Sequence, residues 1–168
     1  MPARLTAQGS LWSRWLRAGI TTGVVDGLFA SFLSGVVYRT GVTRLWQGVA
    51  SVLLGPEALT GGTRTALIGV LMHFGVAFTW SAVFLFLVMR WGRVRRLLAS
   101  PWGVLKVAAV YGPVIWMMMS LVVIPAFTGR SPTITPRWWV NFFGHIPFVA
   151  VPMLWAIGRW PRIRETAP

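Results

Sequence analysis

The chain has 168 residues, of which 55% are hydrophobic and only 11% are charged, and it contains no cysteine. About a quarter of the residues of a soluble domain are charged, so this composition argues against a soluble globular protein, and the lack of cysteine excludes disulfides and thiolate metal sites. The formal net charge of +13 is spread over the predicted loops and both ends of the chain, whereas a nucleic-acid-binding module gathers its basic residues on one face.

Four hydrophobic stretches dominate the sequence, at residues 18–37, 67–89, 107–124 and 138–157. Each has about twenty residues, the length at which an α-helix crosses roughly 30 Å of hydrocarbon. We therefore predict an all-α polytopic membrane protein with a single four-helix transmembrane domain at residues 18–158. Residues 1–17 are expected to form a cytoplasmic N-terminal arm, and residues 159–168 a cytoplasmic tail. The first stretch contains an aspartate and no cleavage site follows it, so we expect a retained helix and not a signal peptide.

Small residues recur at every fourth position of the first stretch, at Gly19, Gly23, Gly27, Ser31 and Gly35. Such a stripe lets two helix backbones approach closely in lipid. It would serve the internal bundle or a homo-oligomer formed through Gly19, Gly23 and Gly27 equally well. Asp26 lies about 60° from Gly23 around the helix, so its side chain is expected inside the bundle.

Residues 43–54 form a short, mostly apolar run between the first and second stretches. The run is too short to cross a bilayer, and a glycine and a proline follow it. This pattern predicts an interfacial or re-entrant helix that ends in a turn.

Prolines interrupt the last two stretches, at Pro113 after Gly112 and at Pro147 and Pro152. Proline removes a backbone donor and frees a carbonyl one turn earlier, which kinks a helix unless neighbours compensate. We favour structural kinks over functional hinges at these positions.

Four polar residues lie within the apolar stretches: Asp26, His73, Asn141 and His145. Ionisable groups at membrane depth are costly and usually face a partner or a cavity. Counted along alternating spans, His73 and His145 each lie roughly 10 Å below the same face, and Asp26 lies near the midplane. The four would form one site if the first, second and fourth helices are neighbours. Asn141 lies one turn before His145 and is predicted to orient it.

Three interpretations of this site remain open. Asp26, His73 and His145 could hydrogen-bond between helices and fix the packing, provide a proton or cation path, or ligate a metal ion or a haem. No motif of a hydrolase, a zinc protease or a phosphate loop is present, and the chain has only three acidic residues. We therefore expect a non-enzymatic protein with no cofactor and a structural or assembly role, with transport or metal binding as the alternative.

Basic residues are distributed unequally between the two predicted sides. The N-terminal arm, the loop after the second stretch with Lys106, and the tail together carry eleven, and the other two loops carry five. The positive-inside rule then predicts that both termini are cytoplasmic. Basic residues at the ends of spans also favour contact with anionic lipid head groups.

Several short motifs are distributed over residues 19–157. They are QGVASVLLG at residues 47–55, Gly61-Gly62, Ala66, Gly69, His73-Phe74, MSLVVIP at residues 119–125, and Gly144-His145 followed by Pro152. These motifs, together with Asp26 in the first stretch, resemble those of a family of small four-helix inner-membrane proteins of bacteria. The family pattern has a glycine at the position of Val52. The resemblance implies the fold and the bacterial inner membrane, but no activity.

Overall fold

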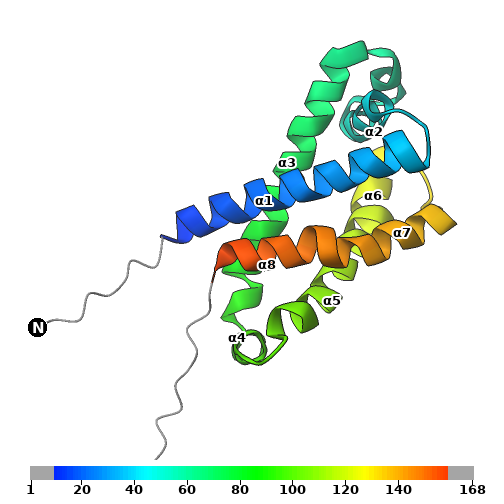
Figure 1. The fold of residues 1–168 in the computed structure, drawn as a ribbon. Coiled ribbons are helices and arrows are strands. Elements are labelled where there is room, and N and C mark those ends of the chain that lie inside the picture. Colours follow the sequence, from blue (N-terminus) through cyan, green and yellow to red (C-terminus); the bar gives the residue numbers. More distant parts are fainter. Residues whose placement is uncertain (1–9, 159–168) are drawn as a thin grey trace, which may run out of the picture.

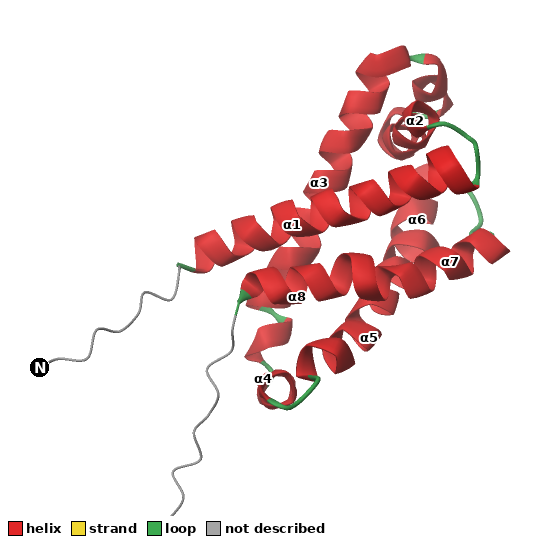
Figure 2. Cartoon of the chain, in the orientation of Figure 1, coloured by secondary structure: helices red, strands yellow, loops and turns green. Residues whose placement is uncertain are grey.

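The computed structural model describes residues 10–158, and every regular element in that range is a helix (Figures 1 and 2). Four helical spans are long and apolar enough to cross a membrane. The first span, Leu11–Val37, consists of α1 (Leu11–Phe32) and a π-helical turn (Leu33–Val37), and the second, Gly62–Arg90, consists of α3 (Gly62–Phe86) and a 3₁₀ turn (Val88–Arg90). The third span, Gly103–Thr128, consists of α5 (Gly103–Met117), a π-helical segment (Met118–Val123) and α6 (Ile124–Thr128). The fourth span, Pro136–Ile157, consists of α7 (Pro136–His145), a π-helical segment (Ile146–Ala150) and α8 (Val151–Ile157). The predicted all-α class with four such helices is confirmed.

The first helix begins earlier than its hydrophobic stretch. Ser10 caps α1, because its hydroxyl oxygen accepts a hydrogen bond from the backbone N–H of Ser13 at 3.2 Å. Residues 11–17, which were predicted as part of the N-terminal arm, are therefore helical. They contain Arg14 and Arg17 and precede the apolar run that begins at residue 18. The predicted tail, residues 159–168, lies outside the described residues.

Two short helices lie between the long ones. A helix is present where one was predicted at residues 43–54: α2, Val42–Leu54, which is followed by a 3₁₀ turn, Pro56–Thr60. Its interfacial or re-entrant placement stays a prediction. Helix α4, Gly92–Ala99, was expected only as a basic loop. Its arginines hide the helical pattern in the sequence, but Leu98 is buried and anchors α4 against the long helices.

The long helices are arranged in two crossing pairs. Helix α3 and the α5–α6 span diverge from α4 like the arms of a V, and α1 and α7–α8 run side by side across both arms (Figure 1). Helix α2 packs on α3 at the open side of the V. There the two backbones touch, because a Cβ at Gly69 of α3 would overlap the carbonyl group of Trp46 in α2.

The glycine stripe of α1 is covered within the chain. A Cβ at Gly19 would overlap the ring of Phe78, and one at Gly23 would overlap the ring of Phe74. Gly27 faces His73 and Trp46. The stripe thus serves the contact between α1 and α3. A homo-oligomer formed through the same glycines stays a prediction from the sequence.

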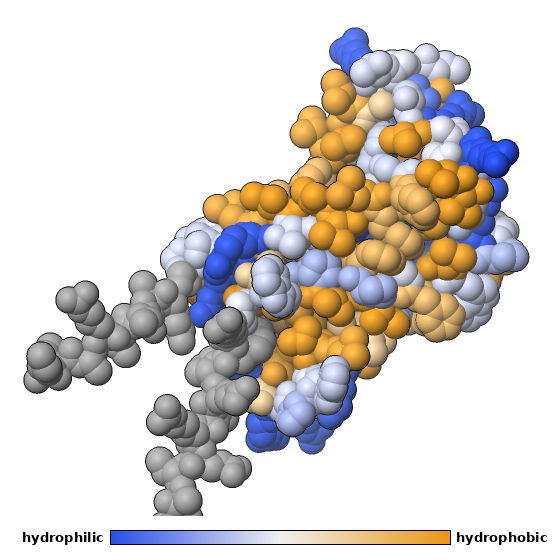
Figure 3. Space-filling view, viewed as in Figure 1, coloured by the Kyte–Doolittle hydropathy of each residue, from blue (hydrophilic) through white to orange (hydrophobic). Residues whose placement is uncertain are grey.

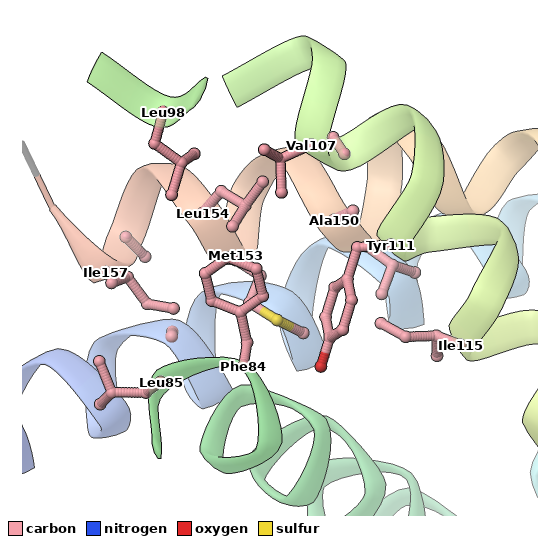
Figure 4. Packing of buried hydrophobic residues seen from close by; sticks show 14 residues of the cluster. Phe84, Leu85, Leu98, Val107, Tyr111, Ile115, Ala150, Met153, Leu154 and Ile157 are labelled. Atoms are coloured by element: carbon pink, nitrogen blue, oxygen red, sulfur yellow. The ribbon is translucent and has the colours of Figure 1, made fainter. Parts of the chain in front are cut away.

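Around α4 and α8 the helices are tightly packed, and we call this region the packed half (Figure 4). Its buried residues are Ala18, Phe84, Leu85, Leu98, Val107, Ala108, Tyr111, Ile115, Val149, Ala150, Met153, Leu154, Ala156 and Ile157. Two side chains also bridge helices here. The hydroxyl of Tyr111 donates to the carbonyl of Trp80 (2.8 Å), and the indole N–H of Trp15 donates to the carbonyl of Phe78 (2.9 Å).

The changes of helix type coincide with the prolines only in part, and the kinks at the prolines stay a prediction. Helix α5 continues through Pro113, and the π-helical segment begins only at Met118. Gly112 instead provides a close contact, because a Cβ there would meet the carbonyl of His145. In the fourth span, Pro147 does lie within a π-helical segment, and Pro152 lies at the start of α8.

On the face shown in Figure 3, apolar side chains cover much of the middle, and hydrophilic ones gather toward the ends. Every long span exposes large apolar residues, among them Leu28, Leu71, Val110 and Trp155. In the most apolar window of each span, between 22% and 44% of the residues are buried inside the protein. Most of the apolar surface of the four spans therefore faces outward.

Candidate functional site

A cavity of about 780 Å³ lies in the half of the molecule opposite the packed half, and we call this region the hollow half. It is bordered by the second half of α1, by α2 and α3, by the segment from Trp116 to Phe127, and by α7. Its walls are mostly apolar and include Leu33, Val49, Val52, Met72, Val76 and Val123. All four predicted site residues, Asp26, His73, Asn141 and His145, line this cavity.

His73 reaches from α3 to the backbone of α1. Its Nε2–H donates to the carbonyl oxygen of Gly23 at 3.0 Å, and its Nδ1 lies 3.9 Å from Oδ2 of Asp26. The imidazole lies beside Gly27, where a Cβ would meet its Nε2 at 3.5 Å, and the ring of Trp46 packs against it edge to face with centroids 5.2 Å apart. With Nε2–H donating to a carbonyl, Nδ1 is the ring nitrogen that faces Asp26.

His145 lies on the other side of the cavity and is 8% exposed. Its Nδ1–H donates to the backbone carbonyl of Asn141 at 2.7 Å, and the ring of Trp116 packs against it with centroids 4.9 Å apart. The three ionisable groups thus line one cavity, with Nδ1 of His73 3.9 Å from Oδ2 of Asp26.

Asn141 orients His145 through its backbone and not through its side chain. The side-chain amide donates to the carbonyl of Arg137 at 2.9 Å, one turn earlier in α7. Asn141 therefore holds His145 through a backbone carbonyl that any residue at this position would supply. The amide still lines the cavity.

Two arginines at the exposed end of the cavity were counted in the sequence only as loop charges. The guanidinium of Arg44 donates to the carbonyl of Leu59 at 2.9 Å, and that of Arg137 lies 4.2 Å from the centroid of the Tyr38 ring. Both arginines line the cavity. The spacing of Arg137, Asn141 and His145, four residues apart on one face of α7, is the signal that indicates a shared role.

A smaller cavity of about 270 Å³ adjoins the first between α5–α6 and α7. Trp116, Ile124, Arg137 and Asn141 line both cavities. The smaller one also has the hydroxyl groups of Ser120, Thr133 and Thr135 in its lining. Polar groups therefore extend from the loop before α7 to the region of His145.

The metal and haem alternatives make different demands on these side chains. In residues 10–158, no three histidine or acidic side chains are placed to hold one metal ion. One nitrogen of each imidazole donates to a backbone carbonyl, as it commonly does in a ligating histidine, and the other nitrogen is not engaged by that bond. Ligation of a haem by the two histidines stays a prediction.

Comparisons with known proteins identify no relative. No protein-family model, no curated protein and no solved structure matches the chain. The similarity to small inner-membrane proteins of bacteria therefore remains a prediction based on the motifs given above.

Proposed function

We propose that the chain is a multi-pass protein of the bacterial cytoplasmic membrane that binds a small, mainly apolar ligand in its cavity. Four apolar spans with outward-facing hydrophobic side chains support the membrane location. The volume of about 780 Å³ lies within the range of roughly 300–1,000 Å³ that is usual for ligand pockets.

The observation that carries this proposal is that Asp26, His73 and His145 line an open cavity. Polar side chains that only fix helix packing are normally enclosed between the helices they join. Protein interiors are also close-packed, and an open volume leaves its lining without packing partners. A large apolar cavity with a cluster of ionisable groups is the usual form of a binding site.

Proton-coupled transport is the alternative that the sequence suggested. The geometry that supports it is the pair of His73 Nδ1 and Asp26 Oδ2, 3.9 Å apart beside the cavity, since histidine and aspartate at membrane depth are usual parts of a proton path.

A structural or assembly role is the second candidate. The observation that favours it is the hydrogen bond from His73 to the Gly23 carbonyl, which directly joins α3 to α1. In that case His73 would affect stability alone, and filling the cavity would have no functional effect.

We further propose that both termini are cytoplasmic, with α4 and its arginines against anionic lipid head groups. The charge bias of eleven basic residues to five supports this orientation. A reporter enzyme that is active only outside the cytoplasm, fused to residue 168, should remain inactive. Activity of that fusion would contradict the orientation.

Filling the cavity tests the binding function directly. Gly48 of α2 lines the cavity, and a Cβ at this position would meet no atom within 4 Å. We expect the purified protein to retain oleyl alcohol in native mass spectrometry, and Gly48→Leu to weaken retention about tenfold without lowering the melting temperature. Val110→Leu, on the outward face of α5, is the matched control. The proposal fails if the wild-type protein retains no oleyl alcohol or if Gly48→Leu binds it as Val110→Leu does.

A further inference from the structure

The proposed binding function leaves open which ligand the cavity accepts, and its charge distribution limits the choice. We propose that the cavity takes a single-chain amphiphile with an anionic head group. The head group would lie between Arg44 and Arg137, and the alkyl chain would lie along the apolar walls toward Asp26. This inference rests on the proposed function and adds the class of ligand to it.

Arg44 and Arg137 bring two positive charges to one cavity. Within residues 10–158, neither Arg44 nor Arg137 forms an ion pair with a carboxylate, and the groups that hold them are a carbonyl and an aromatic ring. Their positive charges are therefore not compensated by the described protein. Two guanidinium groups that line one cavity are suited to a carboxylate or a phosphate, which they bind with several hydrogen bonds.

Tyr38, whose ring lies against Arg137, brings a hydroxyl group to the same region. Tyr38 lines the cavity below the guanidinium of Arg137, and its buried hydroxyl has no hydrogen-bond partner in the described part of the chain. A buried hydroxyl without a partner is unfavourable. An anionic head group at this end of the cavity would bring an acceptor into its neighbourhood.

The orientation of the ligand follows from the opposite end of the cavity. Asp26 is the acidic residue in the lining, and no arginine of its helix, α1, lines the cavity. The cavity walls also include apolar side chains such as Val49, Val52 and Val76, which offer dispersion contacts to an alkyl chain. The anionic group is thus expected at the arginine end and the chain along the walls.

The route of entry fits a ligand that arrives from lipid. Gly75 and Thr79 of α3 and Phe127 of α6 line the cavity and are exposed. These residues lie on the two arms of the V, which diverge at this end of the molecule (Figure 1). The cavity therefore opens sideways between α3 and α6, where an alkyl chain can enter from the bilayer.

The test compares ligands that share a chain and differ in charge. Native mass spectrometry of the full chain released from detergent would measure competition between oleate and oleyl alcohol. We expect oleate to bind about tenfold more tightly than the alcohol, since a hydrogen bond to a charged group contributes roughly 1.5–3 kcal/mol. The double variant Arg44→Gln/Arg137→Gln should lose this preference and keep its affinity for the alcohol.

The control variants separate a specific effect from a general loss of charge. Arg64→Gln/Arg130→Gln removes two arginines on the same predicted side that do not line the cavity, and it should bind oleate like the wild-type protein. Arg44→Lys/Arg137→Lys preserves the charge and should retain at least part of the preference for oleate over oleyl alcohol. This result would show that the glutamine variant loses the preference through its charge and not through misfolding. Lysophosphatidate and oleate as separate ligands distinguish a phosphate from a carboxylate head group, and binding of either supports the proposal.

Three results would overturn the proposal. The first is equal binding of oleate and oleyl alcohol to the wild-type protein, which would leave the binding function intact but remove the anionic head group. The second is an unchanged oleate preference in Arg44→Gln/Arg137→Gln. The third is binding of phosphatidylglycerol, a two-chain anionic lipid, with no binding of either single-chain anion. Failure of the wild-type protein to bind the alcohol as well as the anions would instead reject the binding function itself.

Discussion

The packed half and the hollow half are built from the same four spans but differ in what fills the space between them. In the packed half, α4 closes the narrow end of the V, and Phe84, Met153 and Leu154 fill it with no more than 1% exposure. In the hollow half the arms of the V have diverged, and α2 covers part of the gap without filling it. The comparison indicates that the packed half supplies stability and leaves the other half free to hold a ligand.

The largest expected difference between the two halves concerns side-chain truncation. Phe84→Ala should lower the free energy of unfolding by about 3–5 kcal/mol, because Phe84 is fully buried and its loss leaves a cavity among close-packed neighbours. Val76→Ala, in the cavity wall, should cost less than about 1 kcal/mol, since no packing is broken on its open side. Reversible unfolding in mixed micelles measures both. Equal costs at the two positions would mean that the hollow half is as well packed as the other half.

Two glycines on facing helices test the same distinction within the hollow half. Gly69→Val should destabilise the protein by about 2–4 kcal/mol, because a Cβ would overlap the carbonyl of Trp46 and force α2 away from α3. Gly48→Ala should be neutral or stabilising by up to about 1 kcal/mol, since its Cβ meets open space and alanine favours the helix. The melting temperatures of both variants give the comparison. A destabilising Gly48→Ala would indicate that α2 lies closer to its neighbours than the cavity implies.

The smallest expected effect concerns the hydrogen bond of His73. His73→Phe keeps a ring of similar size but removes the donor to the Gly23 carbonyl, so it should cost roughly 0.6–2 kcal/mol, as interhelical hydrogen bonds in membranes do. Tyr111→Phe removes a comparable donor to the Trp80 carbonyl in the packed half. We expect ligand retention to change in the first variant and to stay constant in the second. Equal retention in both would favour the structural role of His73.

The features that could be predicted from the sequence are those set by local patterns. The length of each apolar stretch is sufficient to predict the four spans, and the run at residues 43–54 is sufficient to predict α2. The glycine spacing predicts that one face of α1 packs closely, and that face lies against α3. Depth along each helix likewise places His73 near Asp26, once α1 and α3 are taken as neighbours.

The remaining features depend on how the helices cross. Arg44 and Arg137 belong to the site because the starts of α2 and α7, far apart in sequence, border the same cavity. No local sequence pattern encodes the divergence of the long helices that opens this cavity. The same holds for Trp116 of α5, whose ring lies against His145 of α7. Helix α4 was missed for a different reason, since its short length and high charge are typical of a loop.

The π-helical segments have a consequence for how the two halves are connected. Each of them borders or adjoins the cavity: Leu33–Val37 and Met118–Val123 contribute to its lining, and Ile146–Ala150 directly follows His145. A π-turn accommodates one additional residue, so the faces of the helices before and after it are rotated by about 100° relative to an uninterrupted α-helix. Deleting one residue from 146–150 would therefore turn His145 away from the cavity while α8 kept its own packing. The direction in which His145 points can thus change while the packed half keeps its fold.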